Sequence, residues 1–157
     1  MNIKTLINEF EKFSSSVRGK TDPVSQYDLE EYINSHSFVF PNEYIQLLSY
    51  SNGISLMGDE IYGIGSTCLD RSIEEVYMIE HTLVSNPMPP SIIPFSPDGF
   101  GNHYCFNSKD DSILFWQHDL PCEVNLKNIV YPSLLCMIKE VFFDWTLANW
   151  DYDGRRR

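Results

Sequence analysis

The spacing of apolar residues changes along the chain, and this change constrains the fold more than any other feature. Up to residue 53 and again after residue 131, apolar side chains recur every three or four positions, as on one face of a helix. Between these parts, apart from one helical stretch over 71–84, they alternate or form short runs, as in strands. This order excludes the regular alternation of strands and helices that builds a parallel sheet. It predicts an α+β fold with a mainly antiparallel or mixed central sheet and helices packed on one face.

Residues that begin or end helices set the limits of these elements. Asp22-Pro23 predicts the N-cap and first residue of the second helix, Asn52-Gly53 the left-handed end of the third, and Asp70 the cap of the fourth. A further strand-like stretch covers 54–56. We expect helices over 2–14, 24–34, 41–51, 71–84 and 132–148, and strands near 60–64, 92–95, 103–107 and 113–117.

The last predicted helix has the clearest apolar face. If its backbone is α-helical throughout, one side of it is buried from beginning to end. The residues predicted on that side are Leu134, Leu135, Ile138, Val141, Phe142 and Trp145.

Composition limits the class of protein. A length of 157 residues with 43% hydrophobic residues fits one folded domain, 1–157. The net charge is −11, and the segment from Asp28 to Asp98 contains eleven acidic residues and one basic residue, Arg71. Such a charge repels nucleic acid and anionic lipid and favours a basic partner. The alternative is that the acidity serves solubility alone.

The chain shows no features of an exported or membrane protein. Its first 16 residues alternate charged and apolar side chains, unlike a signal peptide, and no apolar run approaches the roughly 20 residues that cross a bilayer. The four cysteines are widely separated and form no C-x-x-C pair. The sequence therefore predicts a cytoplasmic protein with reduced thiols.

The stretch PFSPDGFGNHYCFN, residues 94–107, admits three interpretations. Asp98, Asn102 and His103 could bind a metal, but the ligand number and spacing of calcium and zinc sites are missing. His103 and Cys105 could form a thiol–imidazole pair, because residues two apart share one face of a strand. We favour the third interpretation, a turn between core strands with Asp98 bonded to its backbone and Phe100 exposed as a contact. No metal or cofactor is expected.

Two other groups of residues could suggest an enzyme. His118-Asp119 matches the doublet of metal-dependent phosphohydrolases, but here it ends a strand instead of lying on a helix. Glu74, Glu75 and Glu80 share a predicted helix without an identifiable partner base, which is typical of a solvated face. No phosphate-binding glycine motif is present. We therefore expect no catalytic residues and no enzyme.

Four segments together resemble a known family. They are FPNEYIQLLSYSNG (40–53), IYGIG (61–65), IIPFSPDGFGNHYCFN (92–107) and ILFWQHD (113–119). In order and spacing they are similar to the SUKH superfamily, the Smi/Knr-type domains. The resemblance covers the core at 25–150 and leaves 151–157 as a tail.

The resemblance implies a compact α+β domain, used in bacteria chiefly as an immunity protein that binds and neutralises a secreted toxin, often a nuclease. No catalytic residues belong to the pattern. The alternative is a regulatory or scaffold domain that binds an endogenous cellular protein, as the eukaryotic relatives do. The toxin would be a basic protein that meets aromatic anchors flanked by acids. The candidate contact residues are Asp59, Glu60, Tyr62, Asp98, Phe100, Trp116 and Asp119.

Overall fold

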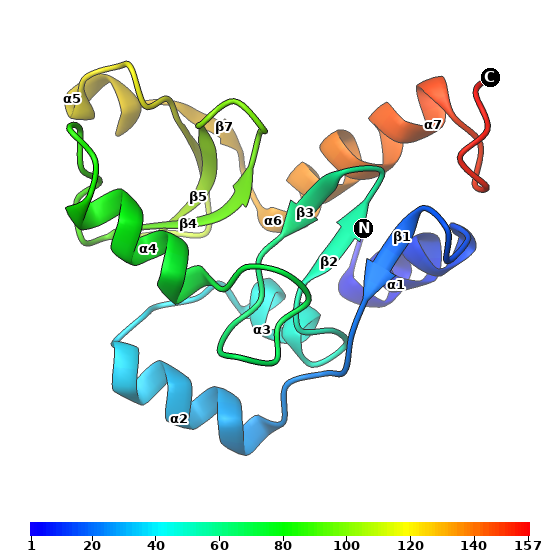
Figure 1. Cartoon of the computed structure of the whole chain (residues 1–157), viewed down its shortest axis with the longest axis horizontal. Helices are drawn as coiled ribbons and strands as arrows, with labels where there is room; N and C mark the ends of the chain where they lie inside the picture. The colour runs from blue at the N-terminus through cyan, green and yellow to red at the C-terminus, as the bar shows by residue number, and fades with distance from the viewer.

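The computed structural model describes all 157 residues, arranged as two antiparallel sheets with helices around them (Figure 1). The helices are α1 (Ile3–Lys12), α2 (Gln26–His36), α3 (Asn42–Leu48), α4 (Ile73–Thr82), α5 (Cys122–Asn125), α6 (Leu134–Met137), the π-helix η1 (Ile138–Asp144) and α7 (Trp145–Asn149). The strands are β1 (Arg18–Lys20), β2 (Ile54–Leu56), β3 (Asp59–Ile61), β4 (Ile92–Pro97), β5 (His103–Asn107), β6 (Ile113–Trp116) and β7 (Ile129–Tyr131).

All neighbouring strands run antiparallel, which confirms the predicted α+β class. The strands form two sheets, ordered β1-β2-β3 and β4-β5-β6-β7, where the sequence suggested one central sheet. The sheets meet where β3 passes β4. There the Tyr62 N–H donates to the Phe95 carbonyl at 2.8 Å, and the Ser96 hydroxyl donates to the Glu60 carbonyl at 2.6 Å. Both sheets also contribute side chains to the main hydrophobic cluster.

The core contains side chains from both sheets and from most of the helices. Side chains alternate between the two faces of a strand, so successive residues of β5 and β6 enter different clusters. Phe106 and Ile113 join the main cluster. The opposite face holds a smaller cluster of Met88, Ile92, Cys105, Leu114 and Trp116.

Two helices begin later than their predicted caps. The N-cap of α2 is Ser25 and that of α4 is Ser72, where Asp22 and Asp70 were expected. Asp22 remains outside α2 because its carbonyl accepts a hydrogen bond from the Asn52 N–H at 3.1 Å, which ties this segment to the end of α3. Tertiary hydrogen bonding thus overrides the local Asp-Pro signal.

The C-terminal helix is not α-helical throughout, and this corrects the predicted position of Trp145. Within η1 the hydrogen bonds span five residues, and the Trp145 N–H donates to the Glu140 carbonyl. The wider turn rotates the following residues away from the α-helical pattern. As a result Trp145 is 56% exposed, and Thr146 takes its place in the interior.

Several short elements escaped prediction. Strands β1 and β7 and helix α5 contain three or four residues each, too few for a periodic pattern. The predicted tail at 151–157 folds back on the domain. Its Tyr152 carbonyl accepts from the Ser14 N–H at 2.9 Å, and its Tyr152 hydroxyl donates to Glu9 at 2.6 Å. None of the helices combines the length and apolarity needed to cross a membrane.

Candidate partner-binding surface

The turn between β4 and β5 is held by one aspartate, as predicted. The Asp98 carboxylate accepts from the Phe100 N–H at 2.8 Å, from the Asn102 N–H at 3.0 Å and from the Asn102 amide at 2.8 Å. Gly99 and Gly101 adopt φ values of 85° and 89°, which favour glycine. Burial alone would raise the pKa of Asp98, but these hydrogen bonds outweigh it and lower the pKa. This carboxylate is therefore a structural part of the turn.

The hydrogen-bonded turn presents Phe100 to solvent. This residue is 80% exposed, a high value for a large apolar residue. The turn is also docked on the end of β6, because the Asn102 side-chain oxygen accepts from the His118 N–H at 3.1 Å. This contact brings the exposed Asp119 next to the turn. Three predicted contact residues, Asp98, Phe100 and Asp119, thus lie in one region.

Two predicted contact residues are not on the surface. Tyr62 and Trp116 are only 3% and 1% exposed. The Tyr62 hydroxyl lies 3.5 Å from the His103 ring, inside the protein, and Trp116 belongs to the smaller hydrophobic cluster. Both side chains face the core and pack there. The prediction that they contact a partner directly is therefore wrong.

The remaining two predicted contacts, Asp59 and Glu60, lie on β3, and the pKa of each is raised. Burial raises the pKa of Asp59, with no other group contributing. Burial and the neighbouring Asp70 carboxyl raise the pKa of Glu60 to about 7, although Arg71 acts in the opposite direction. At neutral pH Glu60 therefore carries only part of a negative charge.

Asp59 lines a groove that sequence reasoning missed. We call it the acid-rimmed aromatic groove, and its volume is about 390 Å³. It lies where β3, β5, β7 and the C-terminal helix meet, so it combines segments far apart in the sequence. Its lining residues are Asp59, Tyr104, Tyr131, Glu140, Val141 and Trp145.

The groove is electronegative and adjoins the β4–β5 turn. Burial raises the pKa of the Tyr104 phenol, and the carboxylates of Asp59, Asp98 and Glu140 raise it further. Tyr104 is the second residue of β5, so the groove begins directly after the turn in the chain. Burial and the neighbouring Glu140 raise the pKa of Tyr131 to about 12. No basic side chain lines the groove.

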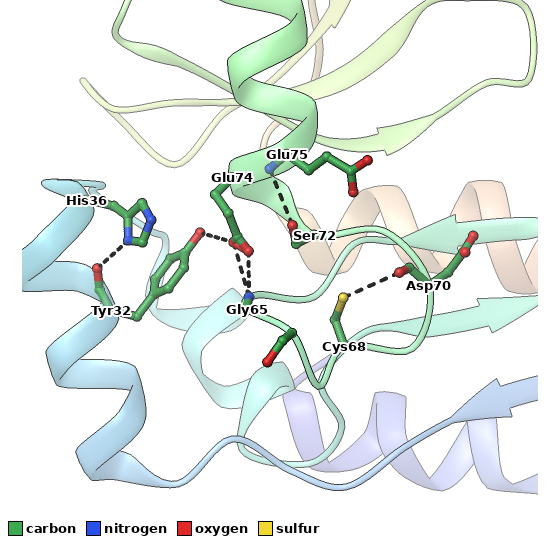
Figure 2. Close-up of a pocket in the computed structure, with 9 residues that line it drawn as sticks. Tyr32, His36, Gly65, Cys68, Asp70, Ser72, Glu74 and Glu75 are labelled. Atoms are coloured by element: carbon green, nitrogen blue, oxygen red, sulfur yellow. Dashed lines mark hydrogen bonds between the residues drawn. The ribbon is translucent and has the colours of Figure 1, made fainter.

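A second hollow, of about 530 Å³, lies between α2, the loop after β3 and α4 (Figure 2). Its central carboxylate, Glu74, accepts from the Tyr32 hydroxyl at 3.0 Å and from the Gly65 N–H. Ser72 accepts from the Glu75 N–H at the start of α4. These polar groups are thus engaged in holding α2, the loop and the start of α4 together.

His103 and Cys105 share one face of β5, but their environment opposes thiol chemistry. The Cys105 thiol is fully buried and donates to the His103 carbonyl at 3.6 Å. Burial raises the pKa of the thiol well above its usual value and lowers the pKa of the His103 ring to about 4. A catalytic pair needs the reverse, a thiolate beside an imidazolium. No three His, Cys, Asp or Glu side chains are grouped as metal ligands.

The fold and this surface define a small antiparallel α+β domain with an exposed aromatic turn beside an acidic groove. The chain belongs to the SMI1/KNR4 family (SUKH-1), whose model matches residues 23–139, and the predicted resemblance is confirmed. No curated protein matches the sequence. Glu140 and Trp145 of the groove lie just beyond the matched residues.

Proposed function

We propose that this protein is a cytoplasmic immunity protein that binds and neutralises a cognate toxin. Membership of the SUKH-1 family supports this role. The observation that carries it is the exposure of Phe100 on a turn fixed by Asp98. An aromatic residue on a turn whose backbone is already hydrogen-bonded loses little backbone conformational entropy on binding, and exposed aromatic residues are typical of interface hot spots. Inhibition then needs no chemistry, only coverage of the toxin's working surface.

The charge indicates the type of toxin. The net charge of −11 favours a basic partner, and the acids around the turn and groove place negative potential beside the anchor. A nuclease that binds nucleic acid must present a basic surface to the phosphates. We therefore propose a nuclease domain as the toxin, bound without any direct contact between this protein and nucleic acid.

The test is protection of cells from toxins encoded beside the gene for this chain. Co-expression should restore growth, and Phe100→Ala should weaken the purified complex by about 2 kcal/mol or more, mainly through faster dissociation. Tyr27→Ala is the matched control, since Tyr27 is similarly exposed, at 73%, but lies on α2. Absence of protection would favour the alternative, a domain that binds an endogenous protein. An equal effect of both substitutions would remove Phe100 from the interface.

A further inference from the structure

The residues that line the acid-rimmed aromatic groove favour a positively charged ligand. Three aromatic rings, from Tyr104, Tyr131 and Trp145, line it together with the carboxylates of Asp59 and Glu140, which come from different elements. Asp59 is half-buried, and burial is the sole influence on its pKa, so no neighbouring cation or donor compensates its charge. A half-buried carboxylate without such a partner loses hydration without compensation.

Other occupants fit this lining less well. An anion would be repelled by both carboxylates and by the overall charge of the protein. A purely apolar side chain would cover Asp59 and Glu140 without supplying hydrogen bonds, at a cost in desolvation. A cation compensates the carboxylates and is attracted to the faces of the rings.

We propose that the acid-rimmed aromatic groove is a binding pocket for an arginine side chain of a protein partner. The guanidinium group is planar, stacks on aromatic rings and presents several N–H donors, so one group can serve Asp59 and Glu140 together. A lysine ammonium is a more strongly hydrated point charge and cannot stack in this way. If the proposed function holds, the arginine belongs to the toxin, and it binds beside the Phe100 turn.

The π-helix is the element that completes the pocket. In an α-helix of 3.6 residues per turn, residues five apart differ by about 140° in direction. In η1 the Trp145 N–H instead bonds to the Glu140 carbonyl, so both residues project into the same groove. Wide turns of this kind are frequent at functional sites.

The experiment uses the full chain labelled with ¹⁵N and a blocked Gly-Arg-Gly peptide as the probe, without any toxin. We expect the indole N–H signal of Trp145 to shift in a saturable way, with a dissociation constant of about 10 mM or tighter. The indole signal of the buried Trp116 should stay unchanged and thereby report an intact fold. The matching peptide with citrulline has the same shape without the charge and should bind at least about tenfold more weakly.

Substitutions of the two groove carboxylates test whether they contact the arginine. Asp59→Asn and Glu140→Gln should each weaken arginine binding by about three- to tenfold, whereas Glu31→Gln on α2, outside the groove, should leave it unchanged. Absence of a saturable shift, equal binding of the citrulline peptide, or no effect of either groove substitution would overturn the proposal. Tighter binding of a lysine or trimethyl-lysine peptide would overturn the choice of arginine. Because no toxin is used, these outcomes are independent of the toxin experiment.

Discussion

The backbone N–H of Trp145 donates a hydrogen bond to the carbonyl oxygen of Glu140, five residues earlier in the chain. This bond ends the π-helix η1, whose wider turns separate the observed C-terminal helix from the α-helix that its sequence predicts. It exposes Trp145, buries Thr146 and places an aromatic ring beside the carboxylate of Glu140. The side of the helix that is exposed therefore depends on how its backbone is hydrogen-bonded.

The π-helical hydrogen bonding predicts that two aromatic truncations in the C-terminal helix lower the free energy of unfolding by different amounts. Phe142 is fully buried, so Phe142→Ala should lower the free energy of unfolding by about 3–5 kcal/mol. Trp145→Ala removes a largely exposed ring and should lower it by less than about 1 kcal/mol. Urea unfolding of both variants gives the comparison. Similar large losses would indicate the α-helical register instead.

The turn aspartate should act through its hydrogen bonds more than through its charge. Asp98→Ala leaves the Phe100 and Asn102 N–H groups without their acceptor and should cost about 1–3 kcal/mol of stability. Asp98→Asn keeps an acceptor oxygen and should cost less. Urea unfolding measures both, and hydrogen exchange at the Phe100 amide reports the turn directly. Equal stability of the two variants would contradict this role.

Glu60 and His103 should give opposite dependences of stability on pH. Folding raises the pKa of Glu60 from 4.5 to about 7, so in this window the folded state holds a proton that the unfolded state releases, and stability falls as pH rises. Folding lowers the pKa of His103 from 6.5 to about 4, so the unfolded state binds the extra proton there, and stability rises with pH.

Two variants separate these opposing effects. The stability of Glu60→Gln relative to the unsubstituted protein should increase as pH rises from about 4.5 to about 7 and then level off. His103→Gln should instead lose the increase in stability between about pH 4 and 6.5. Urea unfolding across this range provides the data. A stability difference for Glu60→Gln that is independent of pH would contradict the raised pKa.

Electrostatic steering of a toxin should depend on acids near the turn that lie outside its hydrogen bonds and outside the groove. Since Asp98 is bonded within the turn, Glu60 is partly protonated and Asp59 lines the groove, the test uses Asp119→Asn. This substitution should slow association with the toxin more than it speeds dissociation, and the effect should fade as salt shortens the screening length from about 10 Å at 0.1 M to about 3 Å at 1 M.

The matched control for steering is Asp28→Asn on α2, which changes the net charge equally on another element. Stopped-flow association rates at two ionic strengths measure both variants. If both substitutions slow association equally, the net charge steers the toxin and the location of the acid near the turn is irrelevant.

The sequence by itself determined the features that depend on residues close to one another along the chain. Helical and alternating apolar patterns, together with prolines and glycines at their ends, were enough to predict the α+β class and most longer elements. The Asp98 turn was also predictable, because its donors lie within four residues of the carboxylate. The four quoted segments were sufficient to indicate the family that the comparison confirmed.

Only the tertiary structure decided which of the candidate residues can meet a partner. Tyr62 and Trp116 look like anchors in sequence, but the sheets on which they pack are assembled from distant segments and bury them. The acid-rimmed aromatic groove brings Asp59 together with residues from 104 to 145, so no local pattern reveals it. The exposure of Trp145 depends on a π-helix, whose extra residue per turn shifts every later side chain by an amount that apolar spacing alone does not encode.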